Sequence, residues 1–269
     1  MKIFIILFLL TTFAFSKVYY SKVEPYEVRD ISSNVTGAVL YADENMLGKK
    51  LSSKPFILID AELDKDELNA VNNKLSYFQD TLEVNEKVLS NLRESLKRKR
   101  ENYENIAKLS IKSRVEKDRE FYDLINNENS FLAIQKEVNS LKANIADLKL
   151  RKAQLLKNIH DKSISLKGFV LYDLKVKAGK VVTVATPLAT VADTSKGLLS
   201  IYLNEDDALN AVNKIIYING QKTKYRVSRI FTIADSKNIS KYKAQIIVNA
   251  PNLFSKLVKV ELRESKNEK

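Results

Sequence analysis

The sequence GAVLY at residues 37–41 returns as GFVLY at residues 168–172, and the two copies continue in the same way. Each copy reaches a Gly-Lys pair, at residues 48–49 and 179–180, then a proline, and ends in a short apolar run followed by an aspartate. Val, Leu and Tyr favour strands, and the Gly-Lys pairs stand where turns are expected. Neither copy has enough strands to bury a sheet face alone, so we predict that the two copies form one small sandwich.

A run of heptads separates the two copies. Alternating steps of three and four residues between apolar positions are typical of a coiled coil. The first pattern comprises Leu68, Leu75, Leu82, Leu89, Leu96 and Tyr103, interleaved with Val71, Phe78, Asn85, Leu92, Lys99 and Ile106. The second comprises Leu124, Phe131, Val138 and Ile145, interleaved with Ile134, Leu141, Leu148 and Leu155. Because the two seams are similar in length, we predict an antiparallel hairpin roughly 70–75 Å long, at about 1.5 Å per residue.

The turn of the hairpin is marked by Ser113 and Glu116. A serine followed three residues later by a glutamate forms a capping box, in which each side chain accepts a bond from the other residue's backbone N–H. The first helix is therefore predicted to end near residues 108–111, and the second to start after Ser113. Asn85 and Lys99 are polar seam positions, which usually cost stability and fix the register.

The residues after the second copy favour short strands. Asn219-Gly220 between apolar residues is a strong signal for a hairpin turn. We expect strands at residues 188–191, 198–203, 214–218, 223–233, 242–248 and 257–262, with a short helix at 205–212. Several short strands after residue 197 predict a small β-barrel. Residues 17–35 are expected to add a strand to the barrel or to the sandwich.

The N-terminus has the form of a secretory signal. A lysine precedes a short apolar run, and small residues stand before Lys17, so residues 1–16 are predicted to be a cleavable signal peptide. The alternative is an uncleaved anchor, although a spanning helix needs about 20 apolar residues. The net charge of +12 could suit a nucleic-acid partner, but an exported protein is not expected to meet one. We therefore interpret the basic residues as part of a solvated surface. The chain has no cysteine, which excludes disulfides and thiol catalysis.

Residues that carry chemistry are few. His160 has no orienting partner in the sequence, and a surface histidine at a helix end is the simpler interpretation. The acidic residues 205–207 could bind a cation, but they also favour the start of a short helix. With six glycines in the chain, no phosphate-binding glycine motif is present. We assign no catalytic, cofactor-binding or metal-binding residue and predict that the protein is not an enzyme.

The predicted fold class is an elongated α+β protein. An antiparallel coiled-coil hairpin is inserted between two halves of a lipoyl/biotinyl-like β-sandwich, and a small β-barrel follows. The predicted divisions are the signal peptide (1–16), an N-terminal β segment with the first half (17–60), the hairpin (61–162, turn near 109–113), the second half (163–196) and the barrel (197–269).

This organisation resembles the membrane fusion proteins of the HlyD type, which are periplasmic adaptors. In that family the hairpin separates the two halves of a lipoyl-like domain. Residues 35–39 and 166–170 resemble the family's opening strands, and PLATVADTS at residues 187–195 is similar to its exit into the barrel. The resemblance covers nearly the whole chain after the signal. Each motif is weak alone, and the specificity comes from their order and spacing.

The resemblance implies a function without catalysis or cofactor. Family adaptors form oligomers, expected here as a ring, and link an inner-membrane transporter, ABC or proton-driven, to an outer-membrane channel. The chain is then expected in the periplasm, associated with the inner membrane through its transporter. Many adaptors carry an Arg-Leu-Ser pattern at the hairpin tip, which corresponds here to Asn102, Ile106 and Ser113. With Leu109 these residues are the predicted partner-binding site, and Asn102 departs from the family pattern because it lacks a charged fork of donors.

Two other functions remain open from the sequence. A lipoyl-like domain can carry a modified lysine in the turn between its halves, but here the hairpin replaces that turn. A coiled-coil scaffold of the cell envelope without a transport role is the main alternative to the adaptor.

Overall fold

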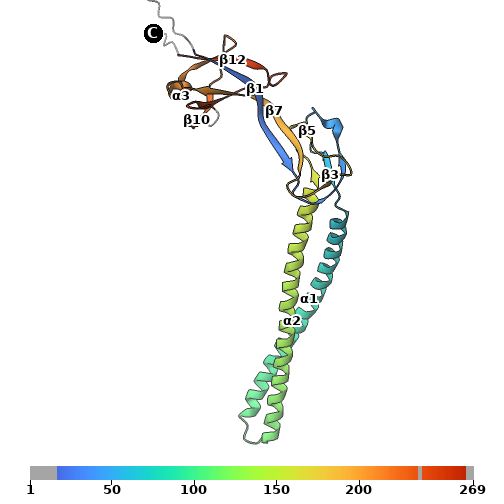
Figure 1. Ribbon diagram of the computed structural model, residues 1–269. Helices are drawn as coiled ribbons and strands as arrows, with labels where there is room; N and C mark the ends of the chain where they lie inside the picture. Colours follow the sequence, from blue (N-terminus) through green and yellow to red (C-terminus); the bar gives the residue numbers. More distant parts are fainter. Residues whose placement is uncertain (1–16, 236–237, 265–269) are drawn as a thin grey trace, which may run out of the picture.

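The protein is elongated, with a helical hairpin at one end, a small sandwich in the middle and a barrel at the other end (Figure 1). This computed structural model describes residues 17–235 and 238–264. The predicted signal peptide, residues 1–16, lies outside the described residues. Within the described ranges, no helix is both long enough and apolar enough to cross a membrane.

The hairpin consists of α1 (Glu62–Ala107) and α2 (Arg114–Asp161). Helices of 46 and 48 residues span about 70 Å, at about 1.5 Å per residue. All the predicted seam positions are buried or half-buried, which confirms the coiled coil. The most deeply buried are Val71, Leu75, Leu89, Leu124, Val138, Leu141, Ile145 and Leu155.

Polar contacts connect α1 and α2 along the hairpin. Near its base, Arg151 donates two hydrogen bonds of 2.6 Å to the carboxylate of Glu67, and Lys162 pairs with Asp64. Further along, Lys142 lies 2.9 Å from Glu86, and Lys99, a polar seam residue, lies 2.6 Å from Asp123. Apart from Lys162–Asp64, which is largely buried, these pairs are exposed. Exposed ion pairs add little stability individually, so we assign them chiefly to setting the register.

The sandwich is built from both copies of the repeat. One sheet has the order β4-β3-β2-β6, and β5 pairs with β7 opposite it. Its strands are β2 (Gly37–Ala42), β3 (Ile57–Ile59), β4 (Ser163–Ile164), β5 (Val170–Leu174), β6 (Val181–Val182) and β7 (Pro187–Leu203), with a short 3-10 turn at Glu44–Met46. The core includes Val39, Phe56, Ile57, Leu171, Val182, Leu188 and Val191.

The two copies interlock through matching hydrogen bonds. The N–H of Gly48 donates to the carbonyl of Leu171, and the N–H of Gly179 donates to the carbonyl of Val39, each at 2.8 Å. Val39 and Leu171 are therefore equivalent, whereas letter-by-letter alignment of the repeat pairs Val39 with Val170. The alignment is one residue off because Gly168, at φ +97°, lies before β5, whereas Gly37 is the first residue of β2. Gly48 and Gly179 both have positive φ, which confirms the predicted turns.

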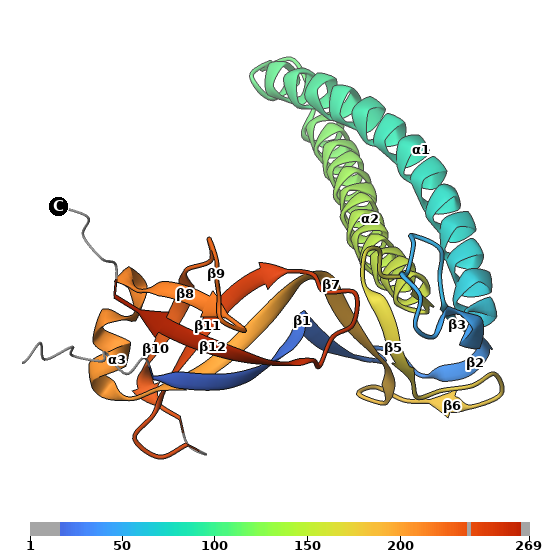
Figure 2. The ribbon, with the colours of Figure 1, turned by 90° about the horizontal axis from the view of Figure 1, so that it is seen from above.

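Two long strands join the sandwich to the barrel. β1 (Val18–Ser32) and β7 run side by side from one to the other (Figure 2). The sequence predicted separate strands at residues 188–191 and 198–203, and this is wrong because β7 is continuous. Gly197 lies inside the strand: a Cβ there would meet the Val23 and Val248 side chains at 2.6 and 2.8 Å. The glycine permits a close approach of strands and does not mark a turn.

The barrel follows as a curled sheet in the order β10-β11-β7-β1-β12-β8-β9. Its further strands are β8 (Ile215–Ile218), β9 (Gln221–Lys222), β10 (Val227–Ala234), β11 (Tyr242–Asn249) and β12 (Leu257–Arg263). Val227 and Ile216, from opposite ends of this order, share one core, so the sheet wraps around it. Asn219 and Gly220 have φ values of +50° and +80°, which confirms the predicted hairpin turn. A short helix α3 (Glu205–Asn210) and a 3-10 turn (Ala211–Asn213) cover one end.

Candidate functional site: the hairpin tip

The hairpin tip, residues 106–117, is held by caps on both helices. The hydroxyl of Ser113 accepts from the N–H of Glu116 at 3.3 Å, and the Glu116 carboxylate accepts from the N–H of Ser113 at 2.9 Å. This is the predicted capping box. The backbone bond from Ser113, followed by the bond from Lys112, lowers the pKa of Glu116. Lys117 donates to the carbonyl of Ala107 at 3.0 Å and so caps the end of α1.

The structure gathers three of the four predicted site residues at this tip. Ile106 is half-buried in the last turn of α1, Leu109 is exposed in the connection, and Ser113 caps α2. Asn102 lies about one turn below them, where its amide donates to Glu120 of α2 at 3.1 Å. Asn102 therefore connects the two helices in this structure.

Sequence reasoning missed two apolar residues at the same place. Ile111 is 87% exposed and Val115 is 78% exposed, beside Leu109 at 44%. Exposed apolar side chains that gather in one place mark contact surfaces better than isolated ones do. The available signal was that Ile111 and Val115 are apolar residues beside the turn and outside the heptad seam.

The acidic residues at the start of α3 have a structural explanation. Asp207 is buried, accepts a 2.6 Å hydrogen bond from the hydroxyl of Tyr19, and pairs with Lys17 at 2.9 Å and Lys214 at 3.2 Å. Burial raises the pKa of this carboxyl, but its three hydrogen bonds outweigh burial and lower the pKa to about 2. Asp207 therefore ties the start of β1 to α3 as an ionised group. Among the described residues, no group of three or more His, Asp or Glu side chains is arranged to hold a metal ion.

The sequence matches no protein-family model and no curated protein sequence. Several solved structures are similar to the fold. MacA from Actinobacillus actinomycetemcomitans matches with a TM-score of 0.68 at 16% identity, over 92% of this chain and 78% of that one. A MacA-MexA chimera containing the Pseudomonas aeruginosa MexA α-hairpin domain matches with a TM-score of 0.64 at 14% identity, over 93% and 82%.

A third structure extends the likeness to a complete chain. The membrane fusion protein Spr0693 from Streptococcus pneumoniae R6 matches with a TM-score of 0.54 at 12% identity, over 93% of this chain and 100% of that one. At these identities the likeness concerns the fold. The chain thus has the fold of the membrane fusion proteins, as the order of its sequence motifs predicted.

Proposed function

We propose that this chain is a periplasmic adaptor that links an inner-membrane transporter to an outer-membrane channel for efflux or secretion. The observation that carries the proposal is the exposed apolar tip, Leu109, Ile111 and Val115, at the end of an arm about 70 Å long. In the described chain, the sandwich and the barrel lie at the opposite end of the hairpin from this tip (Figure 1). An arm of this length with an exposed apolar tip suits contact with a distant partner.

The adaptor acts by binding and assembly, without catalysis. Its tip contacts the channel, and the sandwich and barrel contact the transporter and neighbouring copies in a ring. The protein reaches the periplasm by means of its signal peptide. The support for these roles is the fold shared with membrane fusion proteins together with the sequence resemblance.

The test is a pair of matched substitutions on the hairpin. Ile111→Asp places a charge in the tip, and Leu150→Asp places the same charge on α2, where Leu150 is 61% exposed. We expect cells with Ile111→Asp to lose their tolerance of toxic compounds or their secretion. Cells with Leu150→Asp should keep both, because only the first change disturbs the tip. Both variants should show unchanged helix content by circular dichroism.

A crosslinking measurement gives an independent outcome. A photoreactive residue at position 111, but not at position 150, should crosslink to a protein that mass spectrometry identifies as an outer-membrane channel. Folded Ile111→Asp protein with normal tolerance and secretion would contradict the adaptor role and favour the envelope scaffold.

A further inference from the structure

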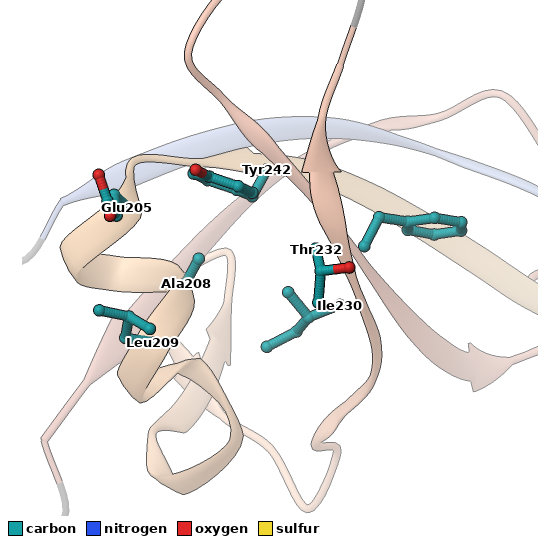
Figure 3. Close-up of a pocket in the computed structure, with 7 residues that line it drawn as sticks. Glu205, Ala208, Leu209, Ile230, Thr232 and Tyr242 are labelled. Atoms are coloured by element: carbon teal, nitrogen blue, oxygen red, sulfur yellow. The ribbon is translucent and has the colours of Figure 1, made fainter.

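A pocket of about 400 Å³ opens at the covered end of the barrel, between α3 and β10 (Figure 3). Ala208 and Leu209 form its wall on α3. The facing wall on β10 is formed by Ile230, Phe231 and Thr232. Tyr242, the first residue of β11, lies at its back. Its volume falls in the lower part of the range of about 300–1,000 Å³ that small-molecule sites occupy.

The packing around α3 explains why this space exists. Ala208 is buried against the barrel core, and its small side chain leaves room that a larger one would fill. Ile230, Phe231 and Thr232 all line the pocket, in a part of β10 where the pairing with β11 is irregular. The ammonium of Lys243 lies 5.7 Å from the centre of the Phe231 ring. The pocket walls are therefore mainly apolar.

The one acidic group that lines the pocket is Glu205, at the start of α3. Within the described residues its carboxylate has no hydrogen bond or ion pair, whereas the nearby Asp207 is fully engaged by Tyr19, Lys17 and Lys214. Lys241, next to Tyr242 in sequence, donates to Asn204 at 2.6 Å. Figure 3 shows the Tyr242 hydroxyl directed toward the side on which Glu205 lies.

We propose that this pocket binds small amphiphilic cations. The apolar body of the ligand lies between α3 and β10, and its positive charge lies against Glu205 and the ring of Tyr242. An aromatic face and a carboxylate both attract a cation. An anion of the same shape would meet the Glu205 carboxylate and be repelled. This proposal is independent of the hairpin tip.

The test measures binding of two probes of one shape and opposite charge to the purified chain lacking residues 1–16. Tetraphenylphosphonium should bind saturably, with one site per chain, in equilibrium dialysis. Tetraphenylborate should bind more weakly. Equal binding of the two ions, or no saturable binding of the phosphonium, overturns the proposal.

Two pairs of variants locate the site. Glu205→Gln should weaken phosphonium binding about fivefold, the effect of losing one partly exposed ion pair of about 1 kcal/mol. Asp206→Asn, the adjacent acid outside the pocket lining, should change it less than about twofold. Thr232→Trp should block the pocket, and Ile233→Trp, at an exposed position of β10 that does not line the pocket, should not. Equal effects within either pair overturn the assignment, and none of these results bears on the tip.

Discussion

Replacing Asn85 by leucine should stabilise the hairpin. The amide nitrogen of Asn85 is buried in the seam without a hydrogen-bond partner. The ion pair between Glu86 and Lys142 places Asn85 level with the buried residues Val138 and Leu141 of α2. A buried donor left unpaired costs about 1–3 kcal/mol, and a leucine would also bury apolar surface there. Because Asn85 is half-buried, we expect a gain of about 1.5 kcal/mol.

Thermal unfolding followed by circular dichroism measures this gain. At about 2–4 °C per kcal/mol for a protein of this size, Tm should rise by about 3–6 °C. Asn91→Leu is the matched control, because Asn91 is exposed on the same helix and gains only the helix propensity of leucine, about 0.5 kcal/mol. If Asn85→Leu raises Tm no more than Asn91→Leu does, the buried amide carries no penalty and the reasoning fails.

Three further changes test the tip, the barrel and the junction. Ser113→Ala should cost about 1 kcal/mol and speed hydrogen exchange at the start of α2, whereas Ser110→Ala in the same turn should not; equal exchange in the two would count against the capping box. Because the pKa of Asp207 falls from 3.8 to about 2 on folding, its contribution of about 2 kcal/mol is present above pH 4 and lost toward pH 2. Urea unfolding should show this loss of stability in the wild type and not in Asp207→Asn. If the unfolding free energies of the two proteins change with pH in parallel, Asp207 makes no such contribution. Gly197→Ala should lower stability by about 1–3 kcal/mol, because the new Cβ meets Val23 at 2.6 Å; an unchanged urea midpoint would contradict the close approach.

The hairpin was predictable because its signals are local. Heptad spacing and the Ser113–Glu116 pair depend only on neighbours in the sequence, and the structure confirms both. The strand β7 was not predictable in the same way, since the polar residues and glycine of 193–197 are typical of a break. Their extended conformation is imposed by strands far away in the sequence: β1 pairs with Asp193 and Gly197, and β11 pairs with Lys196 and Gly197. The one-residue shift of the repeat also arises from contacts between its two copies.

The candidate sites also differ in whether local sequence or tertiary structure defines them. The capping box predicted Ser113 at the turn, and the resemblance to the adaptors' Arg-Leu-Ser pattern then implied Asn102 and Ile106, with Leu109 between them and Ser113. Sequence reasoning missed Ile111 and Val115, because exposure is a property of the folded surface. The barrel pocket could not be predicted from the sequence, since only tertiary packing brings residues of α3 next to residues of β10 and β11.

The insertion of the hairpin inside the sandwich also implies an order of folding. Near the turn, contacts between the helices join Ala107 to Lys117 and Asn102 to Glu120, only 10 and 18 residues apart, so the coiled coil can close first at the tip. It can then zip toward the base, where Asp64 meets Lys162. Joining the sandwich halves across a flexible loop of about 100 residues would cost about 4 kcal/mol in chain entropy. Once the hairpin has formed, most of that entropy has already been lost. The hairpin therefore also brings together the two halves of the sandwich at its base.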